Sequence, residues 1–399
     1  MNDIKLPDPQ TVYHYLSPIA SNGIPKRESA KIIDVGSDQF IDFFNSEILD
    51  NFILDGGSTC RFFEGISGSG KTHLLRLIED YSLDKGFVVC HTPLYKEQSF
   101  DRWDGITRNI LENMRIRDNG REIVGFPKIL EYFGQTKQLK RTEYRNEKLS
   151  HPCFQNAIFY ALNRSRLDYQ ARQLLGIYLS GKKVSVREMK FAGLPRIKKP
   201  LSQKNAEQVL NTVLNSIHFL GLKGTILIFD ETDNTWTPKQ HVPKKVEVAA
   251  NMMRRFVDGC TSGEIKGTTA IFGVLPSFMI DCYHCYPALG QRIQNLSGPD
   301  IRPGWRWHLS TPTGINSHFI GINNPIEQHK IFLEKAVERF GYLVKYCGGK
   351  TDGLEQELLD EGRKAVQNNV GEHYRRDVIR ALSTVCVNRI RESVEPKNA

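Results

Sequence analysis

Four segments rich in apolar, β-branched and aromatic residues mark strands along the chain. They cover residues 59–64, 86–92, 225–231 and 268–274. The run of four apolar residues at 226–229 is continuous, as is typical of a strand that is buried on both faces of a sheet. Because segments with helical periodicity alternate with these strands, we expect an α/β fold, with a parallel sheet and helices on both of its faces.

Apolar residues at helical spacing predict the helices between the strands. One helix is expected over residues 37–54, and another follows the first strand, with Leu74 and Ile78 on its apolar face. The pattern over residues 99–220 is mostly helical, and this stretch is much longer than one crossover between parallel strands requires. We therefore expect a helical insertion at 99–220 inside a nucleotide-binding domain that spans residues 1–310.

The two ends of the chain have different patterns. Residues 1–30 are rich in Pro, Ser and Asn and contain helix breakers such as Pro18, so this segment is expected to wrap the surface before the first helix. Residues 311–399 are predicted to form a smaller helical lid. Its first helix begins at Pro325 and is expected to end at Gly341, and another amphipathic helix follows near the C-terminus.

A phosphate-binding motif lies between the first strand and its helix. Gly65-x-x-x-x-Gly70-Lys71-Thr72 reproduces the P-loop pattern in its strand–turn–helix context. Backbone N–H groups of such a loop and the positive end of the helix form an anion site. Lys71 is predicted to reach the β- and γ-phosphates of ATP, and Thr72 to ligate Mg²⁺. The residues predicted to contact the nucleotide here are Gly65, Ser67, Gly68, Ser69, Gly70, Lys71, Thr72 and His73.

The strand at 225–231 ends in two carboxylates, Asp230 and Glu231. Ligands of parallel sheets bind at the carboxyl ends of the strands. Asp230 is predicted to hold Mg²⁺ through water, and Glu231 to orient and deprotonate the water that attacks ATP. Taken alone, this pattern also fits a strand followed by a solvated turn, but together with the P-loop it indicates nucleotide hydrolysis or sensing.

The formal net charge of +9 is concentrated in one stretch, which we call the 182–199 cluster. It contains the single anion Glu188, and a weaker cluster lies upstream at 137–148. Such clusters fit a phosphate backbone, and they fit a solvated surface loop nearly as well, so both interpretations stay open. The cations of the 182–199 cluster are Lys182, Lys183, Arg187, Lys190, Arg196, Lys198 and Lys199.

The eight cysteines are scattered, which favours reduced thiols over a disulfide framework. Only Cys282 and Cys285 form a CxxC, and without a second pair we interpret them as incidental thiols rather than a zinc or redox site. The polar start and the absence of an apolar run of spanning length predict a cytoplasmic protein with no membrane segment.

The order of these features resembles the AAA+ P-loop ATPases, and more narrowly the ATP-binding proteins of bacterial BREX phage-defence systems, the BrxD and BrxC type. The narrower resemblance is carried by Gly23-Ile-Pro-Lys-Arg-Glu-Ser-Ala30, the run from Phe63 to Thr72, Gly86-Phe-Val-Val89, Leu220 to Glu231, Tyr286-Pro-Ala-Leu-Gly-Gln-Arg292 and Arg376-Asp-Val-Ile-Arg380.

This resemblance implies an Mg²⁺-dependent ATPase that acts with double-stranded DNA and other defence proteins, as a homo-oligomer. It implies Arg292 as an arginine finger, for which a surface arginine is the alternative, and Arg376 as a lid sensor. Leu275 departs from the family pattern, in which a polar sensor often follows the third strand, so turnover is expected to be slow or partner-dependent. The competing functions are a nucleotide-gated scaffold with little turnover and an AAA+ loader of a transposase or helicase.

Overall fold

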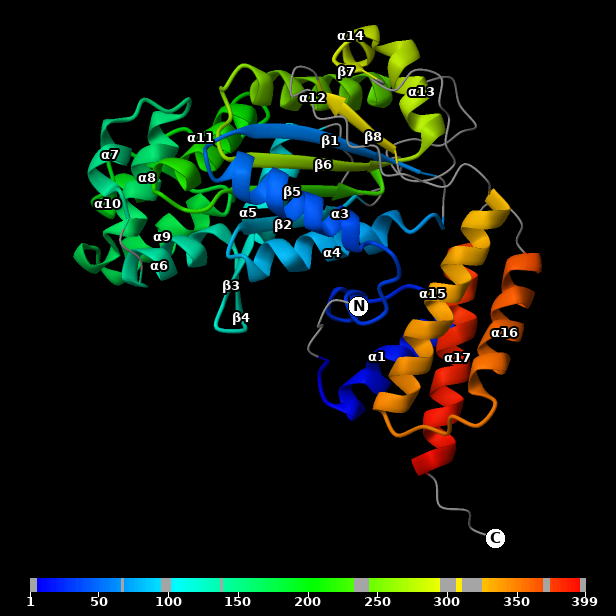
Figure 1. Ribbon diagram of the computed structural model, residues 1–399. Helices are drawn as coiled ribbons and strands as arrows, with labels where there is room; N and C mark the ends of the chain where they lie inside the picture. The colour runs from blue at the N-terminus through cyan, green and yellow to red at the C-terminus, as the bar shows by residue number, and fades with distance from the viewer. Residues whose placement is uncertain are drawn as a thin grey trace.

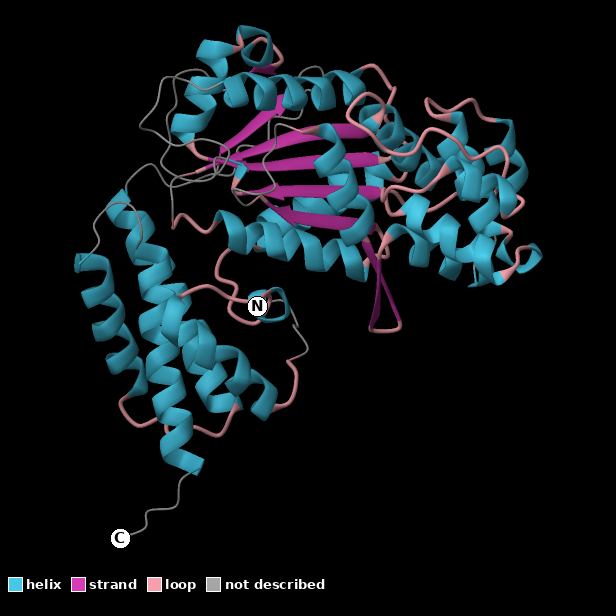
Figure 2. Ribbon diagram, turned by 180° about the vertical axis from the view of Figure 1, so that it is seen from behind, coloured by secondary structure: helices cyan, strands magenta, loops and turns pink. Residues whose placement is uncertain are grey.

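The computed structural model of the protein describes residues 6–65, 68–94, 102–136, 139–232, 244–294, 306–310, 325–368 and 374–394. Within these residues a twisted sheet with helices on its faces lies beside a bundle of long helices (Figures 1 and 2). The predicted α/β class is therefore confirmed.

One mixed sheet runs through the larger part of the molecule, with the strand order β4-β3-β2-β5-β6-β1-β8-β7. The central strands β2, β5, β6 and β1 are parallel, as predicted, and antiparallel strands extend both edges. The strands are β1 (Ser58–Glu64), β2 (Val88–Pro93), β3 (Arg115–Asp118), β4 (Arg121–Val124), β5 (Thr225–Asp230), β6 (Thr268–Val274), β7 (Ile293–Gln294) and β8 (Arg306–Ser310).

Alternate residues of the central strands enter two different apolar cores, so both faces of the sheet are buried as predicted. Phe62, Phe229 and Phe272 share one face, where the ring of Phe272 stacks on Phe62 with centroids 5.1 Å apart and on Phe229 at 4.9 Å. Phe63 and Ile228 enter the other core. Apolar side chains on both faces are what stabilises these strands at the centre of the molecule.

Different helices cover the two faces. One face carries α3 (Asp38–Phe43), the π-helix η1 (Phe44–Ile53) and α4 (Lys71–Asp84), which confirms the helices predicted over 37–54 and after the first strand. The other face carries α5 (Trp103–Asn113), α11 (Ala206–Phe219), α12 (Lys244–Thr261), α13 (Pro276–Cys285) and α14 (Pro287–Gly290).

The stretch between β2 and β5 is mostly helical, as predicted, and its helices gather at one end of the sheet (Figure 1). They are α6 (Phe126–Thr136), α7 (Arg141–Asn146), α8 (Pro152–Leu162), the 3-10 turn η2 (Arg164–Arg166), α9 (Tyr169–Leu179) and α10 (Val186–Phe191). The hairpin β3–β4 in this stretch was not predicted. Asn119 and Gly120 form its tip with φ of 49° and 77°, the left-handed conformations that a two-residue hairpin turn requires.

The expectation that residues 1–30 precede the first helix is wrong, because the helices α1 (Pro9–Asn22) and α2 (Arg27–Ala30) form there. The Asp8 side chain accepts a hydrogen bond of 3.0 Å from Thr11 N, which caps the start of α1. Pro18 lies inside α1. Burial of the apolar face of α1, which includes Leu16, outweighs the hydrogen bond that Pro18 cannot donate.

The second part of the molecule is a bundle of α15 (Pro325–Tyr346), α16 (Leu354–Asn368) and α17 (Tyr374–Val394), against which α1 packs. The prediction that the first of these helices ends at Gly341 is wrong, since α15 continues to Tyr346. A Cβ atom at Gly341 would lie 3.9 Å from Leu358 of α16, an ordinary van der Waals contact, so packing against α16 leaves room at this position and the helix continues through it.

The core of this bundle contains residues from both ends of the chain. Val12 and Ile33 are buried together with Phe340 and Leu382 in a single apolar cluster. The predicted division, with residues 1–310 in one domain and 311–399 in the other, therefore differs from the packing, in which α1 joins the C-terminal helices while α2 packs against α4. None of the helices within the described ranges has the length and apolar character needed to cross a membrane.

Candidate functional site

The sheet register brings the two sequence motifs to one edge. Glu64 of β1 is paired with Val274 of β6, and Phe229 of β5 with Phe272 of β6. The glycine-rich loop that follows β1 and the acidic pair that ends β5 therefore emerge at the same level, with only β6 between them. Carboxyl ends of parallel strands are where sheets of this type bind ligands.

Residues 65–73, which we call the 65–73 loop, lead from the end of β1 into the first turn of α4, and the side chain of Lys71 reaches back to Gly65. Lys71 Nζ donates a hydrogen bond to the carbonyl oxygen of Gly65, so the ammonium group lies over the beginning of the loop. Gly68 and Gly70 have φ of 74° and 94°, conformations that favour glycine. A Cβ atom at Gly65 would lie 2.7 Å from Ser69 Oγ, so any larger residue there would force the Ser69 side chain to move.

Ser69 adds a polar group with no partner of its own. Its hydroxyl oxygen is buried and has no hydrogen-bond partner among the residues that the structure describes, and a buried hydroxyl in that state is unfavourable unless a ligand satisfies it. Ser67, which is also predicted to contact the nucleotide, lies outside the described residues. The other predicted loop residues, Gly65 and Gly68 to His73, are all partly exposed, as a ligand site in this loop requires.

Asp230 is held in place at the end of β5. It is only 3% exposed, and its Oδ1 accepts a hydrogen bond of 2.9 Å from Glu231 N. A Cβ atom at Gly273 of β6 would lie 2.9 Å from the same oxygen, so a side chain at this position would displace the carboxylate. Sequence reasoning missed Gly273, although a glycine inside a buried strand is itself a signal of close approach.

Glu231 follows in a left-handed conformation, with φ of 55°, and its side chain is exposed. The next residue, Thr232, is buried and donates through Oγ1 to Gly273 O at 2.8 Å. The chain is thus anchored on both sides of Glu231, which holds this strained residue at the sheet edge.

The side chains at this sheet edge include the types of oxygen ligand that bind Mg²⁺. Thr72 in the first turn of α4 carries a hydroxyl, and Asp230 carries a carboxylate, which are the oxygen ligands that Mg²⁺ prefers. No group of three or more His, Cys, Asp or Glu side chains that would enclose a metal by itself occurs in the described ranges. A site of this type is completed by water and phosphate oxygens rather than by an all-protein cage.

His73, directly after Thr72, is tied to the N-terminal segment. Its Nε2 lies 2.9 Å from Asp34 Oδ1. Two residues before Asp34, the carbonyl oxygen of Ile32 accepts a 2.7 Å hydrogen bond from Arg339 Nε of α15. One short segment therefore connects the first turn of α4 with the C-terminal bundle. This connection was not predicted, since its members are far apart in the sequence.

Farther along α4, buried ion pairs fix the helix to its surroundings. Glu79 is 4% exposed and lies 3.1 Å from Arg27, 2.7 Å from His91 Nδ1 and 3.7 Å from Arg115. Burial opposes the ionised form of Glu79, but the hydrogen bond with His91 and the charges of Arg115 and Arg27 outweigh it, so its pKa lies below the usual value.

The two predicted arginines are engaged within the chain. Arg292, after α14, forms an ion pair through Nε with Asp258 of α12 and donates from Nη1 to Ala288 O at 2.8 Å. Arg376, in the first turn of α17, donates from Nε to Asn22 O at 3.0 Å and is exposed. Neither contact involves the 65–73 loop, and the predicted roles of both residues stay predictions.

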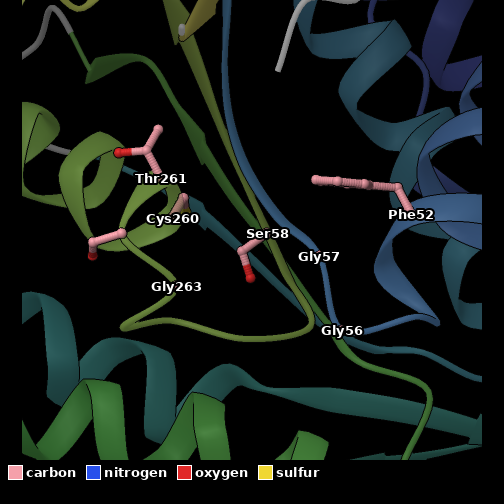
Figure 3. A pocket seen from close by; sticks show the side chains of 8 residues that line it. Phe52, Gly56, Gly57, Ser58, Cys260, Thr261 and Gly263 are labelled. Atoms are coloured by element: carbon pink, nitrogen blue, oxygen red, sulfur yellow. The ribbon is translucent and has the colours of Figure 1, made fainter. Parts of the chain in front are cut away.

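A shallow pocket of 340 Å³ opens at the other end of β1 (Figure 3). It is lined by residues at the start of β1 and the end of α12, including Ser58 and Thr261. The length of β1 separates it from the 65–73 loop by about 20 Å, and no predicted site residue lines it. The site therefore rests on the loop and the acidic pair rather than on this pocket.

The CxxC cysteines show no sign of special reactivity. All eight cysteines are free, and burial raises the pKa of both the Cys282 and the Cys285 thiol. A raised pKa disfavours the thiolate that redox and metal chemistry need, in keeping with incidental thiols.

Residues 20–165 match the family model described as BREX system ATP-binding protein BrxC/D. This confirms the predicted resemblance over a stretch that contains the 65–73 loop, whereas Asp230, Glu231, Arg292 and Arg376 lie beyond it. No curated protein and no solved structure matches the chain.

Proposed function

Since residues 20–165 match BREX system ATP-binding proteins, we propose that this chain binds ATP with Mg²⁺ through the 65–73 loop and hydrolyses it, in an anti-phage defence assembly that acts with DNA and partner proteins. The observation that carries the proposal is the register that brings the start of this loop and the acidic pair to one sheet edge, on either side of β6.

In this proposal Lys71 binds the β- and γ-phosphates, and the loop amides and Ser69 supply further donors. Thr72 and Asp230 hold Mg²⁺, which neutralises negative charge on the phosphates. Glu231, exposed at the sheet edge, accepts the proton of the attacking water. Leu275, at the end of β6, offers no polar group to assist, so slow or partner-dependent turnover is expected.

The nucleotide part of the proposal is tested by calorimetric titration of ATP with Mg²⁺ into the purified protein. Lys71→Ala is expected to abolish binding, because Lys71 Nζ lies over the start of the loop, where its positive charge would contact the β- and γ-phosphates. Lys85→Ala, at the other end of α4, is the matched control, and it should bind ATP like the unchanged protein. Equal affinity in Lys71→Ala and Lys85→Ala would contradict the proposal.

The DNA part of the proposal is supported by the 182–199 cluster. Formation of an oligomer is supported by the position of Arg292 in the chain, after β6. All seven cations of this cluster are exposed. Neutralising several of them should flatten the salt dependence of duplex DNA binding by roughly 0.9 in log K per log salt for each lost phosphate contact. An unchanged salt dependence would return the cluster to the solvated-loop interpretation.

A further inference from the structure

The two most exposed large apolar side chains in the described ranges both lie in the helical insertion. Phe191 is 78% exposed and Tyr169 is 76% exposed, whereas the next, Ile280, is 53% exposed. A single exposed apolar residue is ordinary on a protein surface. Phe191, however, is the last residue of α10 and lies inside the 182–199 cluster. The charged groups around its ring therefore indicate which kind of ligand could contact it.

The surroundings of Phe191 are cationic. Of the seven cations in the 182–199 cluster, only Lys182 has an ion-pair partner in the part of the chain that the structure describes, Glu112 at 3.3 Å. The guanidinium of Arg187 lies over the Phe191 ring, 5.6 Å from its centroid. Residues four apart on a helix share a face, so ring and cation form one surface. We call α10 with the 182–199 cluster the Phe191 surface.

The backbone beneath the Phe191 surface is fixed rather than loose. Met189 and Leu194 are buried in the core of the insertion. The hydroxyl of Tyr178 donates to the carbonyl oxygens of Lys198 at 2.8 Å and Lys199 at 3.3 Å. Lys199 has φ of 53°, a left-handed conformation that is uncommon for lysine and is retained only where its surroundings enforce it. The cations are therefore presented by a segment held in one conformation.

We propose that the Phe191 surface binds single-stranded nucleic acid, with unpaired bases stacking on Phe191 and phosphates contacting the surrounding cations. The bases of a duplex stack on one another, so a duplex offers such a surface mainly phosphates and leaves an exposed ring unused. Each base of a single strand has a free face, on which an aromatic side chain stacks whatever the sequence. This inference rests on the proposed function, because it specifies the form of nucleic acid that the protein contacts.

The test uses the full chain and fluorescence anisotropy with three labelled probes of about 20 nucleotides or base pairs: thymidine DNA, uridine RNA and a mixed-sequence duplex. Phe191→Ala should weaken binding of the single strands by about 10-fold or more and leave the duplex affinity nearly unchanged. The salt dependence of single-strand binding should be the same in Phe191→Ala as in the unchanged protein, because no cation is lost.

Two variants separate stacking from charge. Ile280→Ala removes an exposed apolar side chain of α13 and should leave all three affinities unchanged. The plot of log K against log salt should become less steep by roughly 0.7 per lost phosphate contact on a single strand in the double variant Lys183→Gln/Lys190→Gln. Phe191→Ala should leave its steepness unchanged.

Unchanged single-strand affinity in Phe191→Ala, or an equal loss on single strand and duplex, overturns the inference while the proposed action on duplex DNA stands. Failure to bind any probe overturns the inference together with the nucleic-acid part of the proposed function. ATP titration of the same preparation tests the nucleotide part separately.

Discussion

Glu231 adopts a left-handed backbone conformation, which costs a residue with a side chain about 1–3 kcal/mol. The neighbouring contacts maintain it, since Asp230 accepts from the Glu231 amide and Thr232 is hydrogen bonded to β6. Strain of this kind is concentrated at functional positions. The conformation turns the Glu231 side chain out of the strand direction, so that it is exposed where the chain leaves the sheet.

At the residue scale, a substitution of Glu231 therefore tests whether the chain is an enzyme or a nucleotide-gated scaffold. Glu231→Gln should bind ATP like the unchanged protein, because the residue does not belong to the 65–73 loop. Its turnover should fall by about 10² to 10⁴-fold, the usual contribution of a positioned base. Phosphate release measured with and without DNA checks this. If the unchanged protein hydrolyses no ATP under any of these conditions, the chain acts as a nucleotide-gated scaffold.

At the scale of elements, α4 is the helix on which the site depends, and its buried acidic residues Glu79 and Asp80 are paired with side chains from three separate stretches of chain. Arg27 of α2, His91 of β2 and Arg115 of β3 all contact Glu79. Lys31 and Arg117 contact the next residue, Asp80, at 2.8 Å and 2.7 Å. Removing one member of a buried ion-pair network leaves its partners unsatisfied and typically costs about 3–5 kcal/mol.

Glu79→Ala should accordingly lower the free energy of unfolding at pH 7 by about 3 kcal/mol, the lower end of that range, since Glu122 remains beside Arg27. Because the pKa of Glu79 is lower in the folded chain, its contribution is complete above the unfolded-state pKa of about 4.3 and is lost as the pH falls through and below that value. Urea unfolding across this pH range should show that the free energy of unfolding falls less steeply with decreasing pH in Glu79→Ala than in the unchanged protein.

The control for Glu79 is an exposed ion pair. Asp360→Ala removes the partner of Arg363, 3.8 Å away on the surface of α16, and should change stability by less than about 1 kcal/mol at any of these pH values. A Glu79→Ala protein with the stability of Asp360→Ala would show that the network around α4 contributes little.

Elements with strong local signals were predictable from the sequence. The strand β5 has four consecutive apolar residues, and β1 and β6 are rich in β-branched and aromatic residues. Such segments are typical of strands in a sheet that is covered on both faces. The misses have tertiary causes. Pro18 signals a break, but packing of α1 against α17 overrides it. Gly341 signals a helix end, but α15 continues to Tyr346 because its apolar residues on both sides of Gly341, such as Phe340 and Leu343, are buried in the bundle.

At the scale of the whole molecule, the question is whether one chain completes the site. Arg292 is paired with Asp258 in its own chain, and Arg254 shares this carboxylate at 2.6 Å. An arginine finger acting on a neighbouring subunit would have to leave this pair. Such a finger contributes about 10³ to 10⁵ in rate.

If Arg292 is a finger, Arg292→Ala should bind ATP normally and hydrolyse it poorly, while Asp258→Asn, which frees the arginine, should stay active. Mixing Glu231→Gln with Arg292→Ala subunits should restore activity, since each supplies what the other lacks. Phosphate release as a function of protein concentration and mixing ratio measures this. Equal losses in Arg292→Ala and Asp258→Asn, without recovery on mixing, would make Arg292 a structural residue.

The candidate site was predictable as far as each motif is local in sequence. Lys71 and Thr72 are fixed by the motif, and Asp230 by the strand that precedes it. Gly273 and Asp34 were not predicted, because their roles arise only when β6 lies between β1 and β5 and when the N-terminal segment lies along α4. Such contacts depend on the assembled fold rather than on any stretch of residues.

The packing of α1 against α17 has a consequence for how the protein is made. Val12, Leu16 and Ile19 of α1 leave the ribosome roughly 380 residues before the end of α17, and at about 5–20 residues per second this is a delay on the order of 20 to 75 s. During that time their apolar partners in the bundle do not yet exist. The sheet and its insertion can fold meanwhile, whereas the apolar face of α1 stays uncovered until α17 has been made, and a chaperone that binds exposed apolar surface would protect it during that time.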